Sequence, residues 1–202
     1  MKNTKHQKDF FAEKLFEISK RKNVLDVGGG AGFSKEIGKY KDWFVNTNYR
    51  SFDIPTSRAD IEGDIHDMKL PSESEDAVIC NAVLEHVVDP IRAVDEIYRI
   101  LKPGGLALLQ VPSIYPYHRN KGAGGHEGYG DYWRFFDDTL RYMFRNFSHV
   151  EIVKQSGFFR TMIVFLPFDK RILERPAIFL DRLLKTENKG NTTRGYYIYG
   201  VK

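Results

Sequence analysis

The stretch VLDVGGGAGF, from Val24 to Phe33, decides how this chain folds. A short apolar run contains the acid Asp26 and is followed by glycines at positions 28, 29, 30 and 32. Glycine adopts backbone conformations that other residues avoid, and it lets a ligand approach the backbone closely. We expect a helix to begin near Ser34, so that its unpaired N–H groups point at a ligand on the loop. This order of strand, loop and helix predicts a nucleotide or nucleoside site at the first turn of an α/β sheet.

The spacing of the glycines separates two classes of nucleotide. A dinucleotide fingerprint reads G-x-G-x-x-G, and counted from Gly28 its third glycine falls on Phe33. The order is instead D-x-G-x-G-x-G, with Asp26 two residues before Gly28. A carboxylate there repels a pyrophosphate and attracts a cationic amine. The pattern therefore favours a small nucleoside that carries an amino acid over NAD, and a glycine-rich turn without a ligand is the structural alternative.

Composition places the chain among ordinary globular proteins. Its 202 residues are 42% hydrophobic and 29% charged, enough for one sheet covered by helices on both faces. We read residues 1–202 as one domain, with a cofactor half over about 20–112 and a substrate lid and C-terminal half over about 113–202. The polar start MKNTKHQKDF lacks the apolar core of a signal peptide, and no apolar run approaches the ~20 residues of a membrane span. We therefore expect a cytoplasmic protein.

Charge and cysteine usage exclude several kinds of site. The single cysteine, Cys80, rules out an internal disulfide and a multi-cysteine zinc site, and we expect no metal ion. The net charge of +4 comes from basic residues interleaved with acids, whereas nucleic-acid-binding domains gather theirs on one face. Nucleic acid is therefore not the expected partner, and the sequence carries no signal for an oligomeric state.

Hydrophobic periodicity predicts strands that alternate with helices, which indicates a mainly parallel sheet. An amphipathic helix precedes the first strand, with Phe10, Phe11, Leu15 and Ile18 at helical spacing. The clearest helix starts at the N-cap Asp89 and Pro90, with Ile91, Val94, Ile97 and Leu101 on one face. The other predicted elements are strands at 24–27, 49–53, 59–62, 77–80, 106–111, 150–153 and 196–201, and helices at 34–40, 137–147 and 169–184, the last interrupted at Pro176.

These ordered motifs resemble the class I methyltransferases that use S-adenosylmethionine, over roughly residues 20–155. The resemblance implies a three-layer Rossmann-like α/β fold, whose seven-stranded, mainly parallel sheet has an antiparallel last strand beside the fifth. It implies S-adenosylmethionine as cofactor and S-adenosylhomocysteine as product. The residues implied to hold the cofactor are Asp26, Gly28, Gly30 and Gly32 for its methionine end, Asp53 for the ribose, Asp64 and Ile65 for the adenine, and Asn81 at the end of a strand.

Two of these assignments have alternatives. Asp53 is also explained as a turn residue before Pro55, and Asp67 is the second candidate for the adenine amine. The segment NAVLEHVVDP resembles the "xxLEH" stretch of the family, which brings Glu85 and His86 toward the pocket. A histidine whose hydrogen bonds are satisfied within its loop is the alternative for His86.

The substrate side is predicted in GHEGYGDYWRFFDDTLRYMF, residues 125–144, which resembles the "H…DYxR…L" stretch of methyltransferases linked with surface-glycan biosynthesis. His126 has the chemistry of a general base, and Asp131 would orient it or share its proton. Arg134 is a fixed cation suited to a carboxylate or phosphate, or it pairs with Asp131 or Asp137. Tyr132 and Trp133 offer flat faces to a sugar or the sulfonium, or they belong to the core together with Phe135 and Phe136.

Three function classes follow from these features. The first is methyl transfer to O or N of a small acceptor, with a sugar or glycan precursor as substrate; an RNA acceptor is an alternative. The second is a protein that binds S-adenosylmethionine without turnover. The third adds contact with a membrane surface through residues 158–184, which mix apolar side chains with arginines and lysines. Ordinary packing of that stretch against the sheet is the alternative that we favour.

Overall fold

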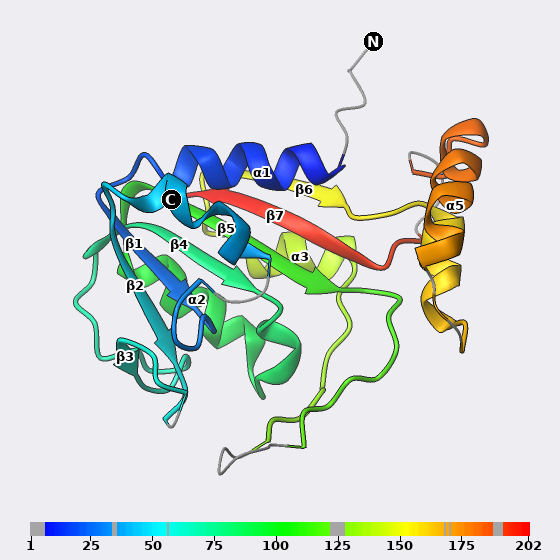
Figure 1. Cartoon of the computed structure of the whole chain (residues 1–202). Helices are drawn as coiled ribbons and strands as arrows, with labels where there is room; N and C mark the ends of the chain where they lie inside the picture. Colours follow the sequence, from blue (N-terminus) through cyan, green and yellow to red (C-terminus); the bar gives the residue numbers. More distant parts are fainter. Residues whose placement is uncertain are drawn as a thin grey trace.

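A mixed sheet forms the centre of the molecule (Figure 1). The computed structural model describes residues 7–33, 36–55, 57–121, 128–167, 169, 171–187 and 192–202. Across these residues seven strands follow the order β3-β2-β1-β4-β5-β7-β6. Their bounds are Asn23–Val27 for β1, Asn48–Asp53 for β2, Ile61–Glu62 for β3, Glu75–Asn81 for β4, Leu101–Pro112 for β5, His149–Lys154 for β6 and Gly195–Val201 for β7.

The pairing of the strands confirms the predicted topology. β1 pairs in parallel with β2 and β4, and β4 pairs in parallel with β5. β7 is antiparallel to both β5 and β6, between which it lies. Because β1 and β4 are neighbours while β2 lies on the other side of β1, the strand order reverses at this point, which is where open α/β sheets bind ligands.

Helices cover both faces of the sheet and produce the expected three layers (Figure 1). Residues on alternate positions of a strand point to opposite faces. Leu25 and Val27 of β1 accordingly join one apolar cluster with helices α2 (Pro90–Ile100) and α3 (Asp137–Met143). Val24 joins a second cluster with α1 (Gln7–Ile18) and the 3-10 helix η1 (Ile37–Phe44). The central strands are buried on both faces, as a parallel sheet requires.

The capping of α2 is as predicted, but its buried face is shifted. The Asp89 carboxylate accepts a hydrogen bond from the Arg92 backbone N–H at 3.0 Å, and Pro90 occupies the first turn. The buried residues after Pro90 are Ala93, Val94, Ile97 and Ile100, whereas Ile91 is 38% exposed. Leu101 already belongs to β5, so the helix ends one residue earlier than its apolar spacing predicted.

Three other predicted helices differ from the structure. The helix expected over 34–40 is the 3-10 helix η1; residues 34 and 35 lie outside the described part, and Gly38 weakens an α-helix there. α3 ends at Met143, and Phe144 and Phe147 fill the core from the following turn. Pro176 lies inside α5 (Arg171–Leu183) and does not interrupt it, because the Ile172 carbonyl that loses its helical partner belongs to a residue exposed to water.

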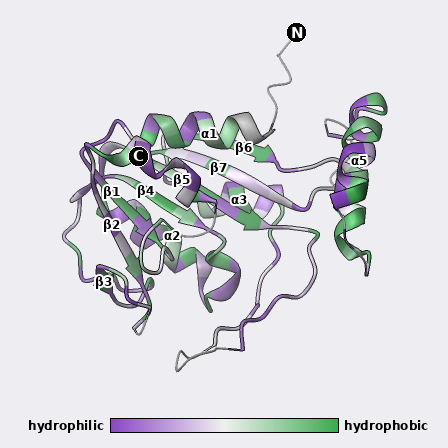
Figure 2. Cartoon of the chain, in the orientation of Figure 1, coloured by the Kyte–Doolittle hydropathy of each residue, from purple (hydrophilic) through white to green (hydrophobic). Residues whose placement is uncertain are grey.

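The stretch over 158–184 does not cover the sheet. Its short helices α4 (Phe158–Met162) and η3 (Ile163–Phe165), which the sequence did not predict, pack against α5. α5 stands apart from the sheet and carries both hydrophobic and hydrophilic residues (Figure 2). Ile172, Phe179 and Leu183 of α5 are more than half exposed. Within the described residues, every helix is too short or too polar to cross a membrane.

Asp181 of α5 fixes α4, and its removal is expected to destabilise this pair of helices. The buried Asp181 carboxylate accepts hydrogen bonds from the backbone N–H groups of Phe159 at 2.8 Å and Arg160 at 3.0 Å, as a helix N-cap does. We expect Asp181→Ala to lower the free energy of unfolding by about 1–2 kcal/mol, measured by urea denaturation. Asp169→Ala, which removes an exposed partner of Arg171, is the control and should cost less than about 0.5 kcal/mol. Equal losses for the two variants would contradict the capping role.

Candidate functional site

The glycine loop after β1 has a shape that only glycine allows. Gly28, Gly30 and Gly32 have φ angles of +75°, +55° and +84°, in the left-handed region. A Cβ atom on Gly28 would lie 2.1 Å from Cγ2 of Val83, so the loop touches the segment that follows β4. The Gly28 N–H donates to the Phe52 carbonyl at 2.7 Å, which ties the loop to β2. The loop is therefore a fixed, open cradle at the strand reversal.

Asp53, at the end of β2, lies beside this cradle as predicted. One oxygen of its carboxylate accepts the Gly30 N–H at 2.8 Å, and the other accepts the Ile54 N–H at 2.7 Å. Each carboxylate oxygen accepts more than one hydrogen bond, so both keep capacity for a ligand hydroxyl. The structure thus supports Asp53 as a group that shapes the loop and faces the groove at the same time.

Asp26 lies beneath the loop rather than on its open side. Its side chain is buried, and a Cβ atom on Gly29 would lie 2.5 Å from Oδ2 of Asp26. Oδ2 also accepts a hydrogen bond from the Tyr49 hydroxyl, whose pKa is raised by burial and by the Asp26 charge. The Tyr49 oxygen in turn accepts the Phe33 N–H at 3.0 Å. Asp26 therefore fixes the loop from below, and its negative charge acts on the open side of the loop across the backbone.

A groove of about 280 Å³ runs over the loop, close to the lower end of the range of small-molecule sites. Its lining combines the open glycines, one carboxylate, and apolar and aromatic side chains, namely Gly28, Gly30, Asp53, Ile54, Ala82, Val83, His86, Val87 and Tyr129. An overlapping pocket continues it past Gly63, Asp64, Ile65 and His66. A flat base with a ribose fits such a lining, because the apolar walls contact the ring and the carboxylate accepts the hydroxyls.

Of the two adenine candidates, only Asp64 lines the groove. Its carboxylate lies 2.6 Å from Nδ1 of His66 and accepts the His66 N–H at 2.9 Å, contacts that lower the pKa of Asp64. The Asp67 side chain lies outside the lining and pairs with Lys69 on the surface. The side chain of Ile65 is buried, Ile65 also lines the overlapping pocket, and the role of its backbone N–H toward the adenine stays a prediction.

A second cavity, of about 360 Å³, opens at the ends of β4, β5 and β7. It shares Ala82 with the groove, and most of the residues that line it have polar side chains: Glu36, Asn81, Ala82, Glu85, Gln110, Pro112, Tyr115, His118, Gln155, Arg194 and Tyr197. Asn81, predicted at the cofactor, lies on this side. The positive φ of +54° at Ala82 turns the chain between the two spaces. The two spaces therefore meet at the end of β4.

The predicted catalytic residues are only partly brought together. His126 lies outside the described residues. The buried Asp131 carboxylate accepts hydrogen bonds from Arg134 at 2.5 and 2.7 Å, and these contacts lower the pKa of Asp131 to about 2. Arg134 also donates to the carbonyls of Tyr115, Pro116 and Trp133. The structure thus favours the alternative in which Arg134 pairs with Asp131, and its role toward a substrate anion stays a prediction.

The aromatic residues beside Asp131 divide between core and surface. Phe135 is buried, whereas Tyr132, Trp133 and Phe136 are exposed by 58%, 43% and 49%. The Trp133 indole N–H donates to the Val87 carbonyl at 2.9 Å. Of the four, only Phe135 therefore follows the expectation of core residues.

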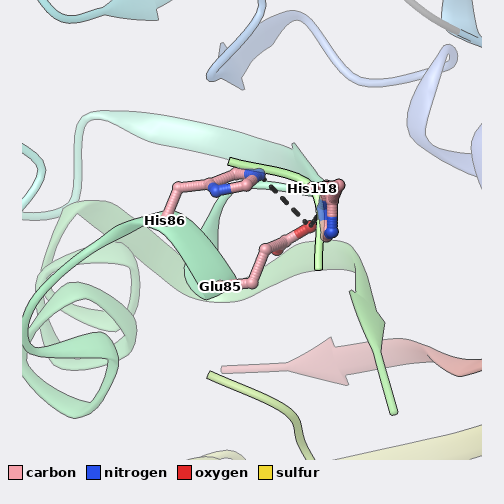
Figure 3. A group of neighbouring side chains, drawn as sticks. All are labelled: Glu85, His86 and His118. Atoms are coloured by element: carbon pink, nitrogen blue, oxygen red, sulfur yellow. Dashed lines mark ion pairs between the residues drawn. The ribbon is translucent and has the colours of Figure 1, made fainter. Parts of the chain in front are cut away.

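His118 is a site residue that the sequence did not reveal. Its backbone N–H donates to Asp131 at 2.8 Å, and its ring Nδ1 lies 3.3 Å from the same carboxylate. Its Nε2 lies 3.7 Å from Oε1 of the buried Glu85, and His86 contacts the same oxygen at 3.8 Å (Figure 3). The segment YPYHR around it carries no recognisable motif, so only the fold brings His118 to Glu85.

Comparison with known proteins agrees with this geometry. A family model described as a methyltransferase domain matches residues 4–159. The chain is 30% identical over 151 residues to 2-methyl-6-phytyl-1,4-hydroquinone methyltransferase 1 of Oryza sativa subsp. japonica, covering 67% of this chain and 40% of that protein. It is 35% identical over 103 residues to a sterol 24-C-methyltransferase of Aspergillus fumigatus, covering 44% and 27%.

Solved structures share the fold. An S-adenosylmethionine-dependent methyltransferase from Archaeoglobus fulgidus superposes with a TM-score of 0.59 at 14% identity, covering 97% of this chain and 94% of that one. A phosphoethanolamine N-methyltransferase of Haemonchus contortus, solved with S-adenosylmethionine, gives 0.56 at 13% identity, covering 96% and 52%. The chain belongs to the methyltransferase-domain family. It spans about two fifths of the length of the curated relatives that it matches over the longest stretches.

Proposed function

We propose that this protein transfers a methyl group from S-adenosylmethionine to an oxygen or nitrogen of a small molecule. The observation that carries the proposal is the junction at Ala82, where the groove over the glycine loop meets a second cavity with polar side chains in its lining. Methyl transfer needs this arrangement, because the donor and the acceptor must be aligned in line and kept from water. Membership of the methyltransferase-domain family supports the same activity.

Different residues of the chain would bind different parts of the cofactor. Asp53 would accept the ribose hydroxyls, while Asp64 and the Ile65 N–H would read the adenine edge. The backbone of Gly28, Gly30 and Gly32, with the Asp26 charge beneath it, would hold the amino-acid end, and Asn81 would lie near the junction. The bound cofactor supplies an electrophilic methyl group on its sulfonium. The remaining task of the protein is to orient the acceptor and exclude water.

The acceptor that the second cavity favours is a polar, hydroxylated molecule such as a sugar or glycan precursor. Gln110, Gln155 and Arg194 are among the side chains that line it, and they offer donors and acceptors for hydroxyl groups. The curated relatives named above act on a phytyl hydroquinone and on sterols. Such largely apolar acceptors would cover these polar side chains and leave them without hydrogen bonds, which is costly.

Calorimetry tests the cofactor, and a methyl-transfer screen tests the acceptor. We expect S-adenosylmethionine and S-adenosylhomocysteine to bind one per chain with micromolar affinity, and NAD not to bind. Radiolabelled methyl transfer should then appear with a sugar or nucleotide-sugar acceptor rather than with a hydroquinone, a sterol or RNA. Binding of NAD in place of S-adenosylmethionine would refute the proposal. Cofactor binding without transfer to any acceptor would favour the non-catalytic alternative, and tight, salt-dependent RNA binding the RNA alternative.

The two acids after β3 give a matched test of the adenine site. We expect Asp64→Ala to weaken S-adenosylmethionine binding by about 10-fold, the value of one charge-assisted hydrogen bond. Asp67→Ala removes the same charge three residues away and should change affinity by less than about 2-fold, because Asp67 lies outside the groove lining. Calorimetry measures the S-adenosylmethionine affinity of both variants. A larger loss of affinity in Asp67→Ala than in Asp64→Ala would assign the adenine contact to Asp67.

Three further assignments belong to the same proposal. His126 would act as general base toward a hydroxyl acceptor, so His126→Ala should lower kcat and leave S-adenosylmethionine affinity unchanged.

We place the protein in the cytoplasm and treat residues 1–202 as one domain. Membrane contact through residues 158–184 stays an alternative, for which vesicle flotation with anionic lipid is the test: a protein that stays at the bottom of the gradient does not bind the lipid surface.

A further inference from the structure

We propose that Glu85, His86 and His118 form a binding site for a divalent transition-metal ion (Figure 3). Each residue offers one ligand atom, and the three atoms lie within 4.8 Å of one another. Oε1 of Glu85 is 3.8 Å from Nε2 of His86 and 3.7 Å from Nε2 of His118. Ligands of a tetrahedral ion with bonds of about 2.1 Å lie about 3.4 Å apart, so both distances from Glu85 are only a few tenths of an ångström longer than such an ion needs.

Hydrogen bonds on the far side of each ring orient both histidines toward this point. Nδ1 of His86 lies 2.6 Å from the Gly130 carbonyl oxygen, which only accepts, so Nδ1 carries the proton. Nδ1 of His118 lies 3.1 Å from the Pro116 carbonyl and 3.3 Å from the Asp131 carboxylate, both closer than the Arg134 Nη2 at 3.5 Å, and these two acceptors favour the same tautomer. Each Nε2 therefore presents a lone pair toward Glu85. Metal-ligating histidines almost always show this second contact to a carbonyl or carboxylate.

The three side chains are held in place before any ion binds. The Glu85 side chain is 1% exposed, and that of His86 is 11% exposed. The Glu85 carbonyl accepts the Tyr132 N–H at 2.8 Å, which fixes the turn that carries both Glu85 and His86. Asp131, itself held by Arg134, fixes the backbone of His118. The site therefore brings three acceptor atoms close together where little water reaches them, and a cation bound between them would satisfy all three.

The ligand set selects the class of metal. Two imidazole nitrogens and one carboxylate suit Zn²⁺, Co²⁺, Ni²⁺, Mn²⁺ or Fe²⁺, whereas Mg²⁺ and Ca²⁺ prefer oxygen ligands alone. Sequence reasoning predicted no metal, because the ligands come from two segments that no motif links. His118 joins the pair Glu85–His86 only through the fold.

The position of the site gives the ion a function. Glu85 and His118 line the acceptor cavity, and His86 lines the cofactor groove, so the ion would lie on the wall between the two. Three protein ligands leave at least one coordination position for an acceptor oxygen, and a bound cation favours loss of the hydroxyl proton. This role rests on the proposed function, whereas binding of the ion does not.

Metal titration of the full chain tests the site without any methyl acceptor. After treatment with a chelator, we expect Co²⁺ and Zn²⁺ to bind one per chain with micromolar or tighter affinity, and Mg²⁺ more than about 100-fold more weakly. Bound Co²⁺ should show visible absorption bands of nitrogen and oxygen ligation. Both metals should raise Tm, a readout that needs no variant. Absence of stoichiometric binding by the folded wild-type chain would overturn the proposal.

Variants then assign the ligands. Glu85→Gln and His118→Asn should each weaken Co²⁺ binding at least about 30-fold and change the absorption bands. His149→Ala is the control, because His149 lies on the surface beside Glu151 and outside the site. Unchanged Co²⁺ binding in both site variants would place the ion elsewhere and overturn the assignment. Calorimetry measures S-adenosylmethionine binding in a separate experiment. If the chain binds metal but no S-adenosylmethionine, the proposed function is refuted and the metal site is not.

Discussion

Gly30→Val is expected to weaken binding of S-adenosylmethionine at least about 100-fold, or nearly 3 kcal/mol, while the chain stays folded. Among the described residues, a Cβ atom on Gly30 would meet only Oδ2 of Asp53, at 4.0 Å, so the unliganded loop has room for it. The two methyl groups of valine would then occupy the groove that Gly30 lines and exclude the ligand from the backbone. Isothermal calorimetry with S-adenosylmethionine measures the loss, and the thermal unfolding midpoint shows that the fold persists.

Gly104→Val is the matched control for backbone strain. Gly104 has a φ of +73°, in the left-handed region like Gly30, and in the part of the chain that the structure describes no atom lies within 4 Å of the Cβ position. Both variants therefore bear the cost of a side chain in the left-handed region, about 1–2 kcal/mol. Gly104 lies at the start of β5, outside the groove and the second cavity, so its variant should bind the cofactor as the wild type does. Wild-type affinity in Gly30→Val would show that the ligand does not lie on the loop.

The parts of the fold that the sequence predicted are those with strong local signals. The run that ends in D-x-G-x-G-x-G predicted a strand followed by a glycine-rich turn, because apolar strand residues, an acid and glycines follow one another without interruption. Asp89 and Pro90 predicted the start of α2 because capping is a local interaction between neighbouring residues. The strand order followed from the resemblance to class I methyltransferases, and β7 lies antiparallel beside β5 as expected.

The parts that the sequence did not predict depend on contacts between distant segments. α4 has only five residues, too few for a periodic pattern, and its N-cap contact comes from Asp181 more than twenty positions later. His118 acquires its position from Asp131 and its neighbour from Glu85. Asn81 ends β4 as predicted, yet it faces the second cavity because the backbone turns at Ala82. Tertiary contacts decide each of these, and they are invisible in local composition.

Arg134→Met is expected to lower the free energy of unfolding by about 3 kcal/mol, the typical cost of breaking a buried ion pair from one side. The Asp131 side chain is fully buried, and Arg134 supplies both of its charged hydrogen bonds. Arg134 also joins the carbonyls of Tyr115 and Pro116 to this pair. The variant would therefore leave an uncompensated charge and release the segment that carries His118. Urea denaturation at neutral pH measures the loss.

A double-mutant cycle with Asp131→Asn separates this structural role from binding of a substrate anion. If Arg134 acts through Asp131, the two substitutions together cost less than the sum of each alone, with a coupling free energy above about 1.5 kcal/mol. Arg141→Met breaks the exposed pair with Asp137 and serves as control, with a cost below about 0.5 kcal/mol. If Arg134 instead binds the acceptor, Arg134→Met raises KM, leaves stability unchanged and shows no coupling. That outcome would return Arg134 to the substrate role that its sequence context predicted.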